Sequence, residues 1–163
     1  MRRAILKKFI LVLLAALCIN SVIFYIASSK MMLKNSKNDM TYTIKAVDSI
    51  LDYDRDLMEQ MERLEAFTDQ DSSRVTLIKS DGTVVTDSDA DAEYLDNHQG
   101  REEIRAAMEQ GEGYARRYSK TLGKTMLYVA CRSEYSDMVL RLAVPYSGIQ
   151  EYLPMLFPAA ILS

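Results

Sequence analysis

A continuous apolar stretch near the N-terminus constrains this chain more than any other feature. Residues 9–27, FILVLLAALCINSVIFYIA, carry no charge. As a helix rising about 1.5 Å per residue they would span roughly 28 Å, close to the ~30 Å hydrocarbon core of a bilayer. The preceding segment 1–8, MRRAILKK, holds four positive charges and no negative one, which is typical of the cytoplasmic side of a membrane helix. We therefore predict a cytoplasmic N-terminus over 1–8, a transmembrane helix over 9–27 and an extracytoplasmic domain after it.

A cleaved secretory signal is the alternative interpretation of this stretch. Signal sequences usually contain about 7–15 apolar residues and end at a cleavage site of small residues. The apolar run here is longer, and the small residues 27–29 lead directly into sequence of helix-forming composition, so we favour an uncleaved anchor. Asn20 and Ser21 lie inside it, where hydrogen bonds to carbonyls of the same helix are favoured over contacts between two copies.

The C-terminal residues form a second apolar segment. Residues 152–163, YLPMLFPAAILS, carry no charge, but as a helix they would extend only about 18 Å, too short to cross a bilayer. We interpret 148–163 as the start of a truncated second transmembrane helix. The alternative is a short apolar tail that packs on the domain or lies in the membrane interface.

Composition narrows the function of the part between the two apolar segments. Residues 28–151 hold 16 Lys and Arg against 23 Asp and Glu, a net charge of −7, which is a poor match for nucleic acid. Cys18 and Cys131 are far apart in the sequence, and with a single histidine they cannot complete a closed zinc site. No Ser–His–Asp arrangement stands out. We therefore predict no metal, no cofactor and no catalytic residue, and an external enzyme has no support.

Residues 30–67 contain no Gly or Pro and indicate one long helix, or two in line, with a gap near Asp54. Apolar residues recur there at three- and four-residue steps, which is typical of an amphipathic helix. We assign 28–71 as a juxtamembrane helical segment and expect its early turns to pair with a second copy and its later turns to pack on a sheet. Core packing is the favoured alternative for most of the stripe. The candidate dimer residues are Met40, Ile44, Val47 and Leu51.

Five short runs of β-type composition and one further helix follow. The predicted strands are 75–79, 84–86, 114–120, 124–132 and 138–144, with the helix at 101–110. Asp81-Gly82, between the first two strands, is a strong hairpin signal. Pro145 is expected to end the last strand, because proline cannot donate to a ladder. Alternation in that strand predicts four inward side chains, namely Met138, Leu140, Leu142 and Val144.

The order of these elements, and several short motifs, resemble a known family. The motifs are RVTLI (74–78), SDGTVVTDS (80–88), NH (97–98), REEI (101–104), GEG (111–113), RYSKTLG (117–123) and LRLAVP (140–145). They cover roughly half of the chain and stand between two apolar segments. Together they resemble the extracytoplasmic PAS-like domain, called Cache or PDC, of PhoR-type membrane sensor histidine kinases. The resemblance implies an α+β fold over 72–147, with a five-stranded antiparallel sheet and a crossing helix after the long juxtamembrane helix.

The resemblance also implies a function. Members of the family carry a HAMP linker, a phospho-accepting histidine and an ATP-binding domain after the second span, and none of these occurs here, so this chain itself is expected to lack enzyme activity. His98 is not the phospho-accepting histidine. We expect a homodimer in the plasma membrane that passes a stimulus, from a small ligand, an ion or a partner membrane protein, through two spans to a kinase. The alternatives are the sensor domain of a chemoreceptor or cyclase, and a stand-alone membrane-anchored binding protein.

Related Cache domains hold small carboxylates or amino acids with an Arg, a Tyr and an Asp on one face of the sheet. The corresponding candidates here are Tyr118, Tyr128, Arg132 and Arg141. A solvent-facing side of the sheet is the favoured alternative for these residues.

Two further features have both a functional and a structural interpretation. His98 is a candidate pH sensor, although a structural entry to the following helix is favoured. An acidic loop is a candidate cation site, although a solvated loop is favoured. The loop carboxylates are Asp87, Asp89, Asp91, Glu93 and Asp96.

Overall fold

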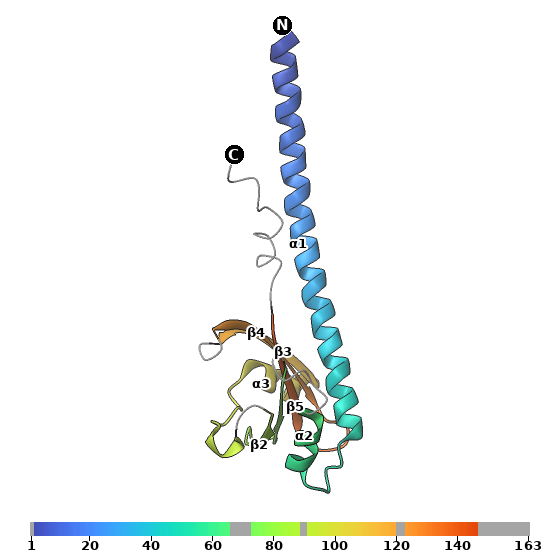
Figure 1. Ribbon diagram of the computed structural model, residues 1–163, viewed down its shortest axis with the longest axis vertical. Coiled ribbons are helices and arrows are strands. Elements are labelled where there is room, and N and C mark those ends of the chain that lie inside the picture. The colour runs from blue at the N-terminus through green and yellow to red at the C-terminus, as the bar shows by residue number, and fades with distance from the viewer. Residues whose placement is uncertain (1, 66–72, 89–90, 120–122, 147–163) are drawn as a thin grey trace. The chain divides into compact units, whose positions relative to one another are not determined.

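The computed structural model describes residues 2–65, 73–88, 91–119 and 123–146. The chain divides into two units, one made of 1–36 and 148–163 and the other of 37–147. The first helix, α1 (Arg2–Ile50), contributes to both. Figure 1 shows the helices and strands of the two units.

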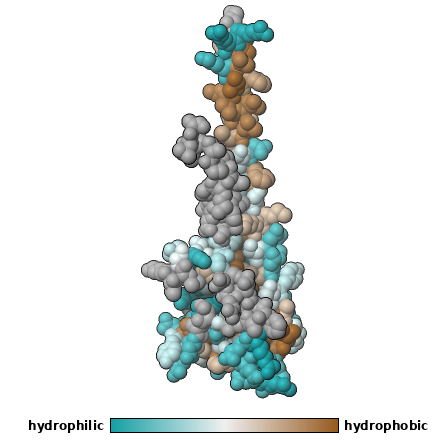
Figure 2. All heavy atoms as spheres, viewed as in Figure 1, coloured by the Kyte–Doolittle hydropathy of each residue, from teal (hydrophilic) through white to brown (hydrophobic). Residues whose placement is uncertain are grey.

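In the first unit, α1 is long and apolar enough, by length and composition, to cross a membrane. Its apolar side chains over 9–27 are almost all exposed, and Figure 2 shows them in brown. A helix that is apolar all round and uncovered by protein has the properties that a lipid environment requires. The predicted start of a second span at 148–163 lies outside the described residues.

The second unit contains a five-stranded sheet in the order β2-β1-β5-β4-β3, with antiparallel pairing between all neighbours. The prediction of an α+β fold with a five-stranded antiparallel sheet is confirmed. β5 occupies the centre, so the last strand in sequence joins the first hairpin to the second. The strands are β1 (Arg74–Ile78), β2 (Val84–Asp87), β3 (Glu112–Ser119), β4 (Lys124–Arg132) and β5 (Val139–Pro145).

Both faces of this sheet are covered. Helix α3 (Glu102–Gln110) packs on one face through Ile104 and Ala107, and the last turns of α1 pack on the other, as Figure 1 shows. Successive side chains of a strand point to opposite faces. Leu140 therefore faces α1 while Val139 faces α3, and both are fully buried. The prediction of a single inward face for β5 was incomplete, because this central strand is covered on both sides and buries residues of both parities from Val139 to Ala143.

The predicted juxtamembrane segment 28–71 contains two helices rather than one. α1 ends at Ile50, and α2 (Leu57–Glu65) follows after a short turn. The Gln60 side chain closes this turn, because its Oε1 accepts from the Asp52 N–H at 2.8 Å and its Nε2 donates to the Asp52 carbonyl at 2.9 Å. Asp56 Oδ1 accepts from the backbone N–H groups of α2's first turn. The gap near Asp54 in the apolar stripe marked this break, and 66–71 lies outside the described residues.

The predicted hairpin at Asp81-Gly82 is confirmed and positions the loop before α3. Gly82 has φ +85°, and a Cβ atom there would lie 2.4 Å from Asn97 Oδ1. The Gly82 carbonyl accepts a hydrogen bond from the His98 N–H at 2.8 Å. Only glycine fits this conformation and this close approach. The hairpin therefore fixes where His98 enters the α3 side of the sheet.

Candidate functional site

A buried ion pair joins α3 to the sheet. Glu103, from the first turn of α3, has no exposed surface. Arg117 of β3 donates to both of its carboxylate oxygens, Nη1 to Oε2 at 2.8 Å and Nη2 to Oε1 at 2.9 Å. Arg141 of β5 places Nη1 3.7 Å from Glu103 Oε1. A carboxylate held by a bidentate guanidinium is among the stronger and more directional polar contacts in proteins.

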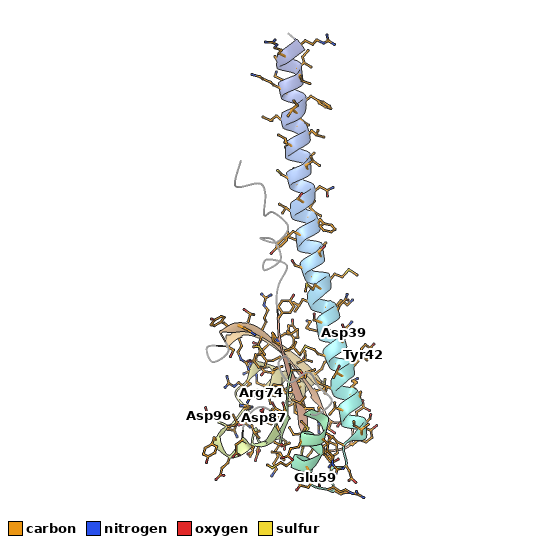
Figure 3. The ribbon with its side chains drawn as sticks, in the orientation of Figure 1. Asp39, Tyr42, Glu59, Arg74, Asp87 and Asp96 are labelled. Carbon is orange, nitrogen blue, oxygen red and sulfur yellow. The ribbon has the colours of Figure 1, made fainter. Side chains whose placement is uncertain are left out.

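A second ion pair lies beside the first, on the same face of the sheet. Arg74 Nε donates to both oxygens of Asp87, at 2.8 and 3.0 Å, and Figure 3 labels the two residues. The Thr76 hydroxyl donates to Asp87 Oδ2 at 2.6 Å and accepts from Arg141 Nη2 at 3.0 Å. Arg141 therefore links the two ion pairs.

Tyr128 of β4 supplies an aromatic wall to these groups. The Arg117 guanidinium carbon lies 3.7 Å from the Tyr128 ring centroid, and that of Arg141 lies 5.6 Å from it. Such contacts stabilise a guanidinium through the negative face of the ring. We call the whole set the charge cluster; it comprises Arg74, Thr76, Asp87, His98, Glu103, Arg117, Tyr128 and Arg141.

The charge cluster contains three guanidinium groups and two carboxylates. Burial alone would raise the pKa of Glu103, but hydrogen bonds and charge from Arg117 lower it below its ordinary value, so Glu103 is ionised at neutral pH. Burial, together with the charges of Arg141 and other arginines, lowers the pKa of His98 to about 4, which leaves its imidazole neutral at pH 7. The cluster therefore contains an ionised carboxylate and a neutral imidazole, both buried.

Two buried nitrogen atoms of the charge cluster have no hydrogen-bond partner within the part of the chain that the structure describes. They are Arg141 Nε and His98 Nδ1. Arg141 is 3% exposed, and burial lowers its pKa against the opposing effect of Glu103. A buried guanidinium N–H without an acceptor is costly. A group that accepts a hydrogen bond from Arg141 Nε would remove this cost.

The structure brings together two of the four predicted ligand residues. Tyr128 and Arg141 lie in the charge cluster. Tyr118 is opposite Thr125 in the β3–β4 ladder, so it lies on the α1 face of the sheet, and it is 63% exposed. Arg132 is exposed at the end of β4. Parity along separate strands did not fix which residues share a face, because the strand register was unknown.

Sequence reasoning missed the other charged members of the charge cluster. Glu103 lies in the first turn of α3, where a carboxylate also suits the positive end of the helix dipole. The signal for its burial was the four-residue spacing to Ala107, which places both side chains on one side of a nine-residue helix. Asp87 was assigned to the acidic loop, but its oxygens are bound by Arg74 and Thr76. Among the described residues, no group of three His, Cys, Asp or Glu could hold a metal.

The four predicted dimer residues, three on α1 and Leu51 directly after it, all belong to the second unit. Met40, Ile44 and Leu51 are buried in the single chain, and Val47 lines a cavity between α1 and the sheet. The outward side of the same turns carries Tyr42, which is 72% exposed. The core packing that was favoured for the stripe accounts for three of these residues, and pairing with a second copy stays a prediction.

One buried carboxylate fixes the end of α1. Asp48 accepts hydrogen bonds from the Ser133 hydroxyl at 2.6 Å, from the Glu134 N–H at 3.0 Å and from the Tyr53 hydroxyl. Ser133 and Glu134 belong to the turn between β4 and β5. Burial, followed by the Asp48 contact, raises the pKa of Tyr53 to about 12. The last turns of α1 are therefore tied to the sheet by directional contacts as well as apolar ones.

Comparison with protein-family models and with curated proteins finds no match. Among solved structures, the chain is similar to the Bacillus subtilis YkuI protein, which has an EAL domain and was solved with c-di-GMP and calcium, at 15% identity and a TM-score of 0.53. It also matches the extracellular domain of rpHK1S-Z16, which has been assigned as a histidine kinase, at 16% identity and a TM-score of 0.44.

These likenesses are partial in both directions. The matches cover 75% and 55% of this chain but only 36% of the YkuI chain and 37% of the rpHK1S-Z16 chain. The chain thus spans little more than a third of the length of either structure. At 15% identity the likeness to YkuI shows the fold alone.

Proposed function

We propose that this chain is the signal-input region of a membrane-bound sensor histidine kinase. In this proposal residues 1–8 are cytoplasmic, 9–27 cross the plasma membrane, and the sheet unit lies outside the cell as part of a homodimer. The observation that carries the proposal is α1 itself. One helix contains an uncovered apolar stretch long enough to cross a bilayer and, further along, residues buried against the sheet. The motif order of the Cache or PDC family supports it.

Signalling in this proposal is a change in how α1 is seated on the sheet. Met40 and Ile44 pack the helix on the sheet, and Asp48 ties its end to the turn between β4 and β5. A stimulus that favours one of two positions of α1 on the sheet would shift the whole helix. The second span and the kinase that would receive this movement are part of the proposal.

The stimulus is proposed to bind at the charge cluster. Its support is the pair of buried nitrogen atoms, Arg141 Nε and His98 Nδ1, that have no hydrogen-bond partner among the described residues. A small carboxylate would supply acceptor oxygens to Arg141, and the Tyr128 ring would form one wall. Tyr118, on the other face of the sheet, and Arg132, exposed at the end of β4, would not take part.

The proposed orientation is tested by labelling in intact cells. In a chain with Cys18 and Cys131 replaced by alanine, single cysteines are placed at Arg3 and at Asp137, which is exposed. A membrane-impermeant maleimide should label Asp137→Cys in intact cells and Arg3→Cys only after lysis. Labelling of Arg3→Cys alone in intact cells would contradict the orientation.

The proposed ligand is tested by titration. Acetate should raise the midpoint of thermal unfolding of the full chain in lipid nanodiscs, and Arg141→Gln should abolish this rise. Arg132→Gln is the matched control, because Arg132 is an exposed arginine at the end of β4, and it should leave the rise unchanged. Equal responses of the two variants would remove the charge cluster from the proposal.

The assignment to a histidine kinase is tested by the residues encoded after Ser163. They should complete a second span and continue into a HAMP linker and a histidine kinase core, and the full protein should phosphorylate itself on histidine. A methyl-accepting or cyclase domain there would favour the alternatives. A stop codon would favour a membrane-anchored binding protein.

A further inference from the structure

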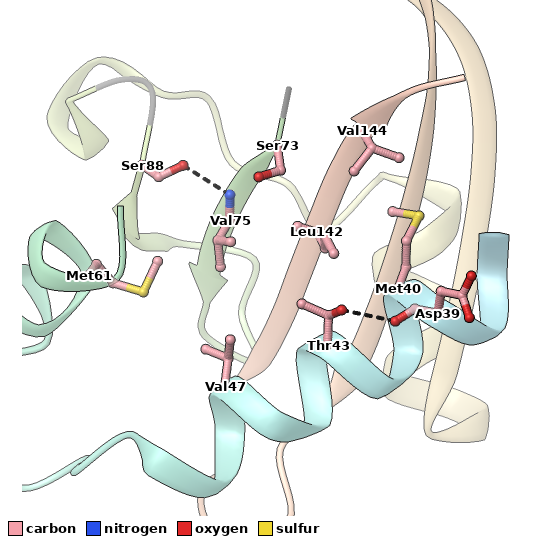
Figure 4. A pocket seen from close by; sticks show the side chains of 10 residues that line it. All are labelled: Asp39, Met40, Thr43, Val47, Met61, Ser73, Val75, Ser88, Leu142 and Val144. Atoms are coloured by element: carbon pink, nitrogen blue, oxygen red, sulfur yellow. Dashed lines mark hydrogen bonds between the residues drawn. The ribbon is translucent and has the colours of Figure 1, made fainter. Parts of the chain in front are cut away.

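A second site lies on the other face of the sheet, away from the charge cluster. A cavity of about 290 Å³ opens between α1, α2 and the strands β1 and β5, and Figure 4 shows it from close by. Every residue that lines it belongs to the second unit. The lining residues are Asp39, Met40, Thr43, Val47, Met61, Ser73, Val75, Ser88, Leu142 and Val144.

The surface of this cavity is almost entirely apolar. Figure 4 shows the side chains of Val47, Met61 and Val75 converging on one space, with Leu142 beside them, whereas the Asp39 carboxylate is directed away. An apolar wall of this kind does not hold water well, because a bound water needs two to four polar partners.

Two polar side chains at the edge of the cavity, Thr43 and Ser88, make hydrogen bonds within the protein. The Thr43 hydroxyl donates to the Asp39 carbonyl at 3.0 Å, and the Ser88 hydroxyl accepts from the Val75 N–H at 3.0 Å. Neither contact requires an occupant. The lining therefore selects against a charged ligand, which would lose its hydration without gaining a partner.

We propose that this cavity binds a small uncharged apolar molecule with a medium-length hydrocarbon chain. The volume is roughly twice the ~150 Å³ of a dry cavity that holds benzene, so it accommodates about eight to twelve carbon atoms. Filling it restores the dispersion contacts that the lining residues lack. Because Met40, Thr43 and Val47 belong to α1, the occupant contacts that helix directly.

The test uses the methionine methyl groups as local reporters. The full chain, labelled with ¹³C at the methionine methyls, is placed in phosphatidylcholine nanodiscs and titrated with 1-octanol. The Met40 and Met61 resonances should shift saturably, because both side chains line the cavity. Met108 and Met126 should not shift, since the former lies on α3 and the latter does not line the cavity.

A filled cavity provides the matched variant. Val75→Phe places a ring in the space and should abolish the saturable shift, whereas Val85→Phe, at a half-buried valine of β2 outside the lining, should preserve it. If Val75→Phe does not fold, xenon under pressure is applied to the unmodified chain instead. It should shift the Met40 and Met61 methyl resonances.

Three results would overturn the proposal. One is a shift that rises linearly with octanol for all methionines, which reports only the altered solvent. Another is a saturable shift that persists in Val75→Phe. The third is a shift of the Met40 and Met61 resonances that depends on the number of chains per nanodisc and not on the octanol concentration. That result would assign the cavity to a second copy of the chain.

Discussion

The two faces of the sheet are built on opposite physical principles. On the α3 face, Arg117 holds Glu103 through two guanidinium nitrogens, and Arg74 Nε donates to both oxygens of Asp87. On the α1 face, Met40 and Ile44 meet Leu142 and its neighbours through apolar contact. β5 contributes to both, because Arg141 points one way and Leu142 the other.

This difference bears on which helix can move. Hydrogen-bonded ion pairs lose most of their energy when the geometry changes, whereas apolar contact depends mainly on area and is non-directional. α3 is therefore locked in one position relative to the sheet. α1 can shift with a smaller loss, apart from its tie at Asp48. A signal carried by helix movement would use α1, so the predictions below compare the two faces.

The largest expected effect is the loss of the central carboxylate of the α3 face. Glu103→Gln leaves Arg117 and Arg141 without a buried counter-charge and should lower the free energy of unfolding by about 3–5 kcal/mol. Urea titration followed by near-ultraviolet circular dichroism measures it. The neighbouring Glu102→Gln is the control, because Glu102 is exposed and should change stability by less than about 0.5 kcal/mol. Similar losses in both variants would contradict a locked α3.

The second largest effect is expected from acid, which should lower the free energy of unfolding through the α3 face. The pKa of His98 is about 4 in the folded chain against an ordinary 6.5, so the unfolded chain binds the proton first as pH falls. Stability should therefore decrease from pH 6.5 towards pH 4, by up to about 3 kcal/mol. The lowered pKa of Glu103 acts in the same direction but only below its ordinary value of 4.5. His98→Gln should remove the slope between pH 6.5 and 4.5, and an unchanged slope would contradict this assignment.

The tie at the end of α1 is expected to contribute less. Asp48→Asn keeps an acceptor for Ser133 but presents an amide to the Glu134 N–H, which should cost about 1–3 kcal/mol. The pKa of Tyr53, now about 12 because of burial and then Asp48, should decrease in the variant, which ultraviolet titration of the phenol measures. Asp54→Asn, at an exposed position in the following turn, is the control. A Tyr53 pKa that does not change would show that Asp48 has little influence there.

The regular parts of the fold were predictable because local chemistry decides them. The alternation of side chains over 124–132 predicted a strand with the limits that β4 has in the structure. Gly82 indicated a turn that requires positive φ. The uncharged run 9–27 likewise predicted the exposed apolar part of α1. Each of these signals depends on neighbours in sequence, so a single sequence contains them.

The charge cluster was not predictable in the same way. Its members come from all five strands, one helix and a loop, and they meet only because β5 lies at the centre of the sheet. The sequence around Arg141 and Arg117 gives no indication that Glu103 lies next to them in the fold. The break between α1 and α2 was partly predictable. Asp54 interrupted the apolar stripe, but the Gln60 contact that closes the turn joins residues eight apart.

The smallest expected effect concerns a lysine of α1 that contacts an aromatic ring on the α1 face. Lys37 Nζ lies 3.3 Å from the Tyr114 ring centroid, at an edge strand where Tyr114 is 53% exposed. Lys37→Gln should cost about 0.5–1 kcal/mol, since exposed cation–π contacts are weak, and Lys45→Gln, at an exposed lysine of the same helix, should cost less. Urea titration resolves this difference in a double-mutant cycle with Tyr114→Leu. A coupling as large as that of Glu103 with Arg117 would mean that strong directional contacts hold α1 beyond its tie at Asp48, and the contrast between a locked α3 and a shiftable α1 would fail.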